Sequence, residues 1–249
     1  MKITKVYCEH YRWPKEKPIA NGKHVYTHNE LNRVCVETDE GITGYGSSWA
    51  VHNIEEIAAP IIGEDPLNTE RLWSKLYVPK FLGRRGNTLW TISAIDIALW
   101  DIRSKVTKLP LYQLLGGYRE SIPFYIAGGE NESTRYGFRD LINTQAVSIL
   151  NPDATCTGGV TEFLKIASLA SANGVAMSPH GQQQVHIHLD CAVPGSILAE
   201  FYPPQYDAKV YEAFKNPIIM NADGTISPGK EPGTGLDINE EVLKDYRIG

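Results

Sequence analysis

The sequence predicts an α+β segment over residues 1 to about 120 and an α/β segment from residue 147 onward. The first segment opens with stretches in which apolar and polar residues alternate, as in half-buried strands, and continues into amphipathic helices. The second segment alternates apolar strand-like runs with helical runs, which implies right-handed βαβ units in a parallel sheet. With 249 residues and 42% hydrophobic content, the chain can build a substantial core.

Strands are expected near the N-terminus over residues 2–9 and 31–38, where Val34 and Val36 alternate with polar neighbours. A turn and a third strand-like run follow, so the pattern is that of a meander. The segment between the first two strands, residues 13–30, contains two prolines, a glycine and many polar residues. We expect it to form a long loop, and such loops in compact domains are often functional.

Helical periodicity follows over residues 53–62 and 68–77 and is strongest over 91–106. That last segment starts with a cap-like arrangement of Ser93 and Asp96. Its apolar residues fall on one stripe: Ala94, Ile95, Ala98, Leu99 and Ile102. The stripe predicts a helix that packs one face against a core.

The second segment contains three expected strands with helices between them. The strands are expected over 147–151, 174–178 and 196–201, the helices over 159–173 and 184–193, and a short closing helix around 239–246. Because consecutive strands are joined by helical segments, they should lie parallel.

Composition and charge exclude several classes of protein. The formal charge is −5 and no Lys/Arg cluster occurs, so a nucleic-acid partner is not expected, although a small anionic substrate is compatible. The N-terminus lacks the apolar core of a signal peptide and no run of about 18 apolar residues occurs, so we expect a cytoplasmic protein without a membrane partner. The four cysteines lie far apart without a CxxC pair, which favours buried thiols over a zinc or redox site.

Three polar residues follow the ends of successive expected strands. Asp153 follows the first, His180 the second, and Glu200 lies at the end of the third. Side chains beyond the carboxyl ends of parallel strands converge, and an Asp beside a His can orient the ring as a general base. A surface or hydrogen-bonding role is the alternative for an isolated His, and His186 and His188 point to different helix faces, which favours structural roles over a metal pair.

Five sequence motifs resemble the mandelate-racemase and muconate-lactonizing enzymes of the enolase superfamily, with the closest likeness to sugar-acid dehydratases. The motifs are SAIDIALWDIRSKVTKLPLYQLLGG at 93–117, GRRG at 83–86, GENEST at 129–134, NPDATCTGGVTE at 151–162 and SPH at 178–180. The resemblance implies an α+β capping domain over residues 1–120, followed over 121–249 by a TIM-type (β/α) barrel and a C-terminal return segment.

The resemblance also implies roles for individual residues. Glu130 matches the last of three carboxylate ligands to Mg²⁺, His180 and Asp153 match the catalytic base pair, and Glu200 matches the acid near the substrate carboxylate. The implied reaction removes the proton α to the carboxylate of a sugar acid and then eliminates the β-hydroxyl, with racemisation or epimerisation as the nearest variant. In the capping-domain loops the candidates for substrate contact are His24, Tyr26 and Trp49. Because members of the family tend to form symmetric assemblies, the resemblance also implies a homo-oligomer.

The chain departs from this family in the middle of the barrel. A complete barrel takes about 250 residues, and only 249 − 120 = 129 residues follow the capping domain. The expected first barrel strand, 122–129, runs directly into a segment that resembles a late strand, so a Lys-x-Lys pair and two carboxylate ligands have no counterpart. We therefore expect an incomplete barrel in which Glu130 alone binds Mg²⁺ poorly. The alternative function is that of an inactive homologue that acts in association with other chains.

Overall fold

The computed structural model describes the backbone of residues 1–21, 24–78, 86–125 and 132–249. It describes the side chains of the same ranges except those of residues 19–21, 24 and 125. In this part of the chain no helix is both long and apolar enough to cross a membrane.

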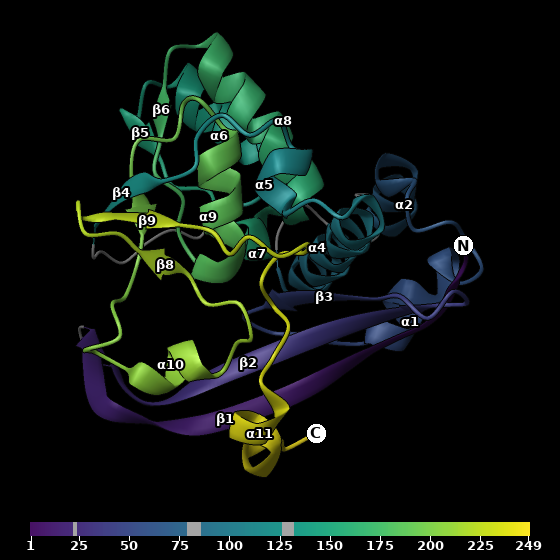
Figure 1. Ribbon diagram of the computed structural model, residues 1–249. Helices are drawn as coiled ribbons and strands as arrows, with labels where there is room; N and C mark the ends of the chain where they lie inside the picture. Colours follow the sequence, from purple (N-terminus) through teal and green to yellow (C-terminus); the bar gives the residue numbers. More distant parts are fainter. Residues whose placement is uncertain (22–23, 79–85, 126–131) are drawn as a thin grey trace.

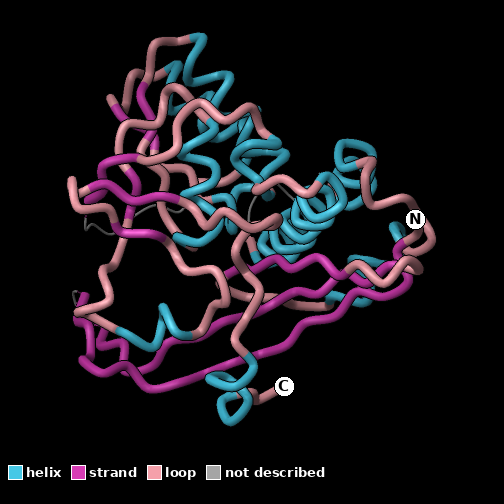
Figure 2. The backbone as a smooth tube through the Cα atoms, in the orientation of Figure 1, coloured by secondary structure: helices cyan, strands magenta, loops and turns pink. Residues whose placement is uncertain are grey.

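The N-terminal part contains the predicted three-stranded meander, in the order β1-β2-β3. Its antiparallel strands are β1 (Ile3–Asn21), β2 (His24–Thr38) and β3 (Thr43–Ser48). The strands β1 and β2 form a long ribbon along one side of the molecule (Figure 2).

The prediction of a long loop over residues 13–30 is wrong, because β1 and β2 extend through the described part of that segment. Proline is tolerated in β1 because this strand lies at the edge of the sheet, where a missing N–H need not break a ladder bond. A register shift between Pro14 and Ile19 takes up the extra residues. Residues near the C-terminus cover another part of this edge, where His10 N donates to Gly249 O at 2.7 Å.

Helices cover one face of this sheet (Figure 1). They are α1 (Ile54–Ala58), the 3-10 helix η1 (Ala59–Ile61), α2 (Thr69–Leu76) and α4 (Asn87–Thr107); the short helix α5 (Leu111–Leu114) follows α4 and lies beside the second part of the molecule. The first three and α4 confirm the predicted helical segments, and the predicted apolar stripe of α4 is buried. β3 approaches α4 so closely that a Cβ on Gly44 would lie 2.1 Å from Ala98 O, and one on Gly46 would lie 1.9 Å from Ala94 O. Only glycine allows this contact.

The second part alternates short strands and helices as predicted. Its strands are β4 (Ile122–Tyr125), β5 (Ile149–Leu150), β6 (Ala176–Met177), β7 (Ala199–Glu200), β8 (Ile219–Met220) and β9 (Thr225–Ser227). Its helices are α6 (Thr134–Asn143), α7 (Ala154–Thr157), α8 (Gly159–Ala172), α9 (Gln183–Ala192), α10 (Ala208–Glu212), α11 (Glu240–Leu243) and the 3-10 helix η2 (Lys244–Tyr246).

Four of these strands run parallel in the order β5, β6, β7, β4. β5 pairs with β6, a parallel bridge joins Met177 to Ser196 just before β7, and β7 pairs with β4. The start of β4 pairs antiparallel with β9, which in turn pairs with β8. The described strands do not close into an eight-stranded barrel, so the prediction of a capping domain followed by an incomplete (β/α) barrel is confirmed.

Helix α4 joins the two parts of the molecule through Asp96, whose side chain is fully buried. Asp96 accepts hydrogen bonds from the backbone N and the hydroxyl of Thr161 in α8, at 2.9 and 2.7 Å. A Cβ on Gly159 would lie 2.4 Å from Asp96 Oδ2, so α8 must also begin with a small residue. Burial raises the pKa of Asp96 to about 7, although Thr161 opposes the shift.

Replacing Asp96 with Asn should change how stability depends on pH. In the unfolded chain an Asp carboxyl has a pKa of about 3.9, so the folded state holds this proton more tightly and stability is lost as pH rises from about 4 to 7. Relative to wild type, the free energy of unfolding of Asp96→Asn should therefore increase across this window, by about 1.4 kcal/mol per unit of pKa difference. Urea unfolding at pH 5 and pH 8 measures the change. The exposed residue Asp140 gives the control, Asp140→Asn; an equal difference between wild type and Asp96→Asn at both pH values would contradict the prediction.

Candidate active site

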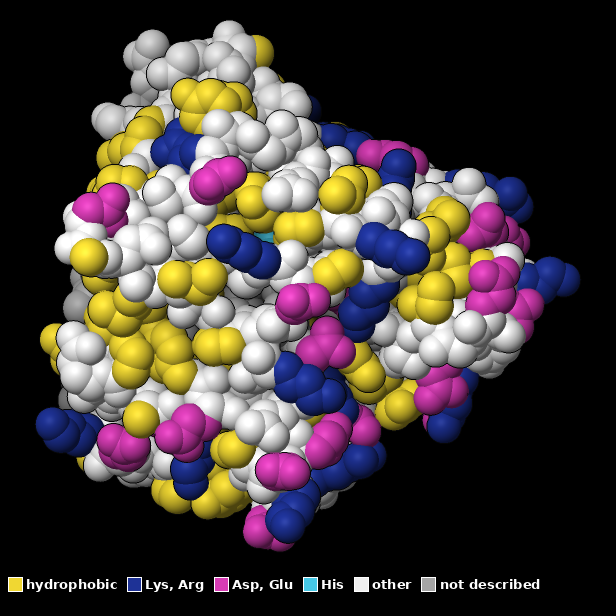
Figure 3. Space-filling view, in the orientation of Figure 1, with side chains coloured by type: hydrophobic (Ala, Val, Ile, Leu, Met, Phe, Trp, Pro, Cys, Tyr) yellow, Lys and Arg dark blue, Asp and Glu magenta, His cyan; other side chains and the backbone are white. Residues whose placement is uncertain are grey.

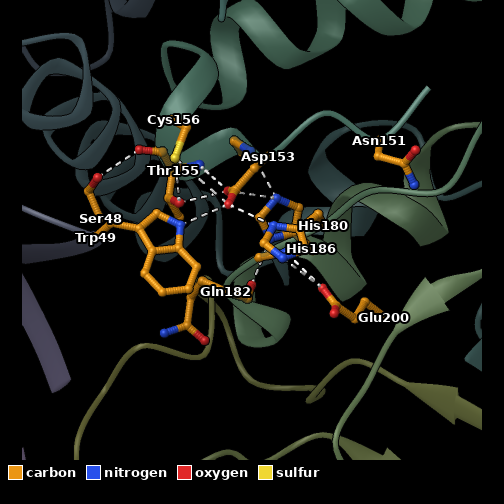
Figure 4. A network of polar contacts seen from close by, with 12 residues as sticks. Ser48, Trp49, Asn151, Asp153, Thr155, Cys156, His180, Gln182, His186 and Glu200 are labelled. Carbon is orange, nitrogen blue, oxygen red and sulfur yellow. Dashed lines mark hydrogen bonds and ion pairs between the residues drawn. The ribbon is translucent and has the colours of Figure 1, made fainter. Parts of the chain in front are cut away.

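The three predicted site residues Asp153, His180 and Glu200 lie together at the carboxyl ends of the parallel strands (Figure 4). Asp153 follows β5, His180 follows β6, and Glu200 ends β7. His180 lies between the two carboxylates, with Nδ1 3.3 Å from Asp153 Oδ2 and Nε2 3.5 Å from Glu200 Oε2. Convergence at strand ends thus brings together three residues that are far apart in the sequence.

Asp153 is buried and its carboxylate oxygens are engaged by several donors. Oδ1 accepts from the backbone N of Thr155 at 2.8 Å and from its hydroxyl at 2.6 Å, while Oδ2 accepts from Trp49 Nε1 at 3.1 Å. Burial opposes ionisation, but the hydrogen bonds and the neighbouring rings of His180 and His186 hold the pKa of Asp153 below its ordinary value. Gly181 passes so close that a Cβ there would lie 2.3 Å from Asp153 Oδ2.

Glu200 is also buried, but the pKa of its carboxyl shifts in the opposite direction. Burial raises the pKa of Glu200, and the nearby His180 opposes this shift only in part. Its oxygens accept hydrogen bonds from Gly181 N at 3.2 Å and from the Tyr202 hydroxyl at 2.9 Å. The imidazole therefore lies between a carboxylate that favours the ionised form and one that retains its proton more readily, an arrangement suited to moving protons.

Of the remaining predicted site residues whose side chains the structure describes, only Trp49 is brought into contact with Asp153 and His180. Trp49 reaches the pair, since its indole donates to Asp153 and its ring stacks on His180 with a centroid separation of 6.2 Å. Tyr26 lies half-exposed in β2 and is not among the side chains bonded to Asp153 or His180. Glu130 and the side chain of His24 lie outside the described residues.

The two helical histidines occupy structural positions. His186 accepts a hydrogen bond from Ala154 N at 2.9 Å, and its Nδ1 lies 2.8 Å from Gln182 O. His188 accepts from Tyr112 N at 3.3 Å, and burial lowers its pKa to about 3. These contacts agree with the interpretation of both rings as structural, although His186 also lies 3.5 Å from Asp153 Oδ1.

Sequence reasoning missed two supporting residues, Thr155 and Tyr202. Thr155 stands two residues after Asp153, and an Asp that accepts from the N–H two residues on is a common N-cap pattern. Tyr202 stands two residues after Glu200, and such residues share one face of an extended strand. Both spacings were visible in the sequence.

The predicted magnesium ligand, Glu130, does not belong to the part of the chain that the structure describes. Mg²⁺ requires near-octahedral oxygen coordination, whereas both oxygens of Asp153 are engaged by Thr155, Trp49 and the histidines. Across the described part of the chain, no group of three or more His, Cys, Asp or Glu side chains is arranged to hold a metal ion.

Each of the two parts of the chain matches the sequence model of a known protein family. Residues 110–242 match the sequence model of the family described as "Enolase C-terminal domain-like". Residues 3–116 match that of "Mandelate racemase / muconate lactonizing enzyme, N-terminal domain".

The curated and solved relatives extend across the whole chain. A 3,6-anhydro-alpha-L-galactonate cycloisomerase of Streptomyces coelicolor is 21% identical over 365 aligned residues, covering 99% of this chain and 100% of the relative. Because this chain has 249 residues, at least 365 − 249 = 116 aligned positions have no counterpart in it. An L-talarate dehydratase of Polaromonas sp. JS666, solved with Mg and L-glucarate, has a TM-score of 0.86 at 23% identity and covers 100% of this chain and 98% of its own.

A Streptomyces coelicolor A3(2) racemase solved with bound magnesium has a TM-score of 0.85 at 21% identity, and the match covers 99% of this chain and 100% of that one. The chain therefore belongs to the enolase superfamily, with the two domains of its mandelate racemase and muconate lactonizing enzyme branch.

Proposed function

We propose that this chain carries the proton-transfer part of a sugar-acid dehydratase site, in which His180 removes the proton α to the substrate carboxylate. The observation that carries the proposal is the position of His180 between Asp153 and Glu200. The dehydratase solved with L-glucarate supports a sugar acid as the substrate class.

The geometry supports a division of roles among the three residues. When His180 Nδ1 carries a proton toward Asp153, Nε2, which lies on the side of Glu200, carries the lone pair that accepts the substrate proton. The ionised Asp153 then stabilises the imidazolium that forms. Glu200, which lies on the other side of His180 and whose pKa is raised by burial, is placed as the acid near the substrate. A racemase would begin with the same α-proton loss, so this part of the site serves either reaction.

Two observations support magnesium as the metal of such a site: two solved relatives contain it, and Glu130 matches one of its ligands in the family. The described residues supply neither the remaining ligands nor a site of their own. We therefore propose that the chain as it stands lacks the charge stabilisation that its relatives obtain from the metal.

Turnover by this chain alone should accordingly be near background. Loss of a single donor that stabilises an oxyanion costs on the order of 10²-fold or more in rate, and here several groups are absent together. Screening a library of sugar acids, with Mg²⁺ titration by calorimetry beside it, measures both properties.

The matched comparison is a version of this chain into which the barrel segment that it lacks has been inserted from a relative. The restored version should turn over a sugar acid, and His180→Asn in it should abolish that turnover. Stoichiometric Mg²⁺ binding with ordinary turnover by the unrestored chain would refute the idea that its site is incomplete. An active restored chain that tolerates His180→Asn would refute the base assignment.

A second candidate function is association with another chain, and the exposed ends of the strand array favour it. Among the described strands β5 pairs only with β6, and Ile149 on it is 41% exposed. A cavity of about 230 Å³ beside it is lined by Ile149, Asn151, Ser178, Ile197 and Leu198. At the opposite end, β8 exposes Ile219 and Met220, and Figure 3 shows hydrophobic side chains gathered over this region. Unpaired strand edges and apolar patches of this kind are typical of interaction surfaces.

We expect the purified chain to form an oligomer that depends on the β5 edge. Light scattering after size-exclusion chromatography measures its mass, and the double substitution Ile149→Lys with Ile197→Lys should reduce the mass to that of a monomer, because charges would have to be buried at the contact. Ile62, which is 46% exposed on the other part of the molecule, provides the control Ile62→Lys. A wild-type chain that is monomeric at every concentration would contradict self-association.

A further inference from the structure

Trp49 reaches from the N-terminal sheet into the pair formed by Asp153 and His180. It directly follows β3, and Ser48 before it donates its hydroxyl to Thr155 O at 2.7 Å. The side-chain amide of Asn32 donates to Trp49 O at 2.9 Å and so fixes the backbone from β2. The position of Trp49 is therefore set on two sides, by the sheet and by the segment that carries Asp153.

The side chain of Trp49 makes two different contacts with the pair. Its indole N–H donates to Asp153 Oδ2, the same oxygen that faces His180 Nδ1. Its ring lies nearly parallel to the imidazole of His180, at an interplanar angle of 12° (Figure 4). One side chain thus bonds to the carboxylate and lies parallel to the ring that the carboxylate faces, with the ring centroids 6.2 Å apart.

These contacts are notable because Trp49 itself is 60% exposed, whereas Asp153 is 1% exposed. An exposed indole N–H can bond to water, so its engagement with a buried carboxylate requires a directed geometry. A hydrogen bond to an ionised acceptor is stronger than one between neutral groups. The other indoles with described partners bond to neutral acceptors, Trp73 to Gly158 O and Trp100 to Thr161 Oγ1, both at 2.8 Å.

We propose that Trp49 is a positioning residue for the base: it holds the Asp153 carboxylate through its indole N–H and shields His180 with its ring. The placement of the N-terminal sheet thereby sets the geometry of the proton-transfer groups. This inference rests on the proposed function of His180 and Asp153, and it assigns to Trp49 a role through these residues rather than through the substrate.

The hydrogen bond can be tested by NMR of the indole N–H groups, using the chain as it is. Trp49→Phe identifies the Trp49 signal by its loss from the five expected for this chain. In Asp153→Asn, where the acceptor loses its charge, the Trp49 signal should shift and its exchange with solvent should accelerate. The signals of Trp73 and Trp100 should stay in place, because their acceptors are unchanged. A Trp49 signal that is insensitive to Asp153→Asn would overturn the proposal.

The shielding of His180 can be tested by its chemical reactivity with diethyl pyrocarbonate, followed by mass spectrometry. The His180 side chain is 17% exposed. In Trp49→Ala its modification rate should rise by about threefold or more, a factor in the range expected for loss of an aromatic pair. Trp49→Phe keeps a ring in place and should restore a rate close to that of wild type. The exposed His28 provides an internal control whose rate should be the same in all variants.

The outcomes separate this inference from the proposed function. Circular dichroism establishes that each variant is folded, and the response of the Trp49 indole N–H to Asp153→Asn provides the test if Trp49→Ala does not fold. Equal His180 reactivity in the wild type and Trp49→Ala, or failure of Trp49→Phe to restore protection, would overturn the positioning role. Neither measurement uses turnover, so an inactive restored enzyme would count against the proposed function and leave this result intact.

Discussion

The arrangement of the molecule depends on two buried carboxylates of helix α4, Asp96 and Asp101. Asp96 accepts both hydrogen bonds from Thr161 at the start of α8. Asp101 accepts from Thr234 N at 2.7 Å near the C-terminus and from Tyr45 N at 2.9 Å in β3. Burial raises the pKa of both carboxyl groups, and these donors, with Lys105 beside Asp101, offset the cost of burying them. One helix thereby ties the sheet, the strand array and the C-terminal segment together.

This docking explains how a residue of the sheet can take part in a site built at the ends of the strands. The close approach of Gly44 and Gly46 to α4 fixes the distance between β3 and the helix. At the end of β3, Ser48 and Trp49 then lie against the segment of Thr155 and Asp153. A displacement of β3 by the width of one methyl group would separate these contacts, so packing far from the pair controls its geometry.

Much of the fold could be predicted from local patterns, and the exceptions have physical causes. The stripe of α4 and the alternation of strands and helices after residue 147 are properties of neighbouring residues, which periodicity reports directly. The segment 13–30 was mispredicted because its prolines and polar residues are compatible with an edge strand, and a single sequence does not show which strand lies at an edge. The contact of Trp49 with Asp153 links residues 104 positions apart and depends on tertiary packing.

The site could be predicted in part for a related reason. Asp153, His180 and Glu200 were found because strand ends in a βα array converge regardless of side-chain detail. The same rule explains how an incomplete barrel can keep Asp153 and His180, the pair proposed as the base, in contact. Each βα unit contributes a polar side chain from the end of its own strand. When consecutive units are absent, the side chains at their strand ends are absent together, and those of the other units stay in place. The units of β5, β6 and β7 remain in contact with one another, and each still receives its partners from the next. The groups proposed for proton transfer therefore all lie at strand ends that the structure describes, whereas Glu130, the proposed magnesium ligand, lies outside the described residues.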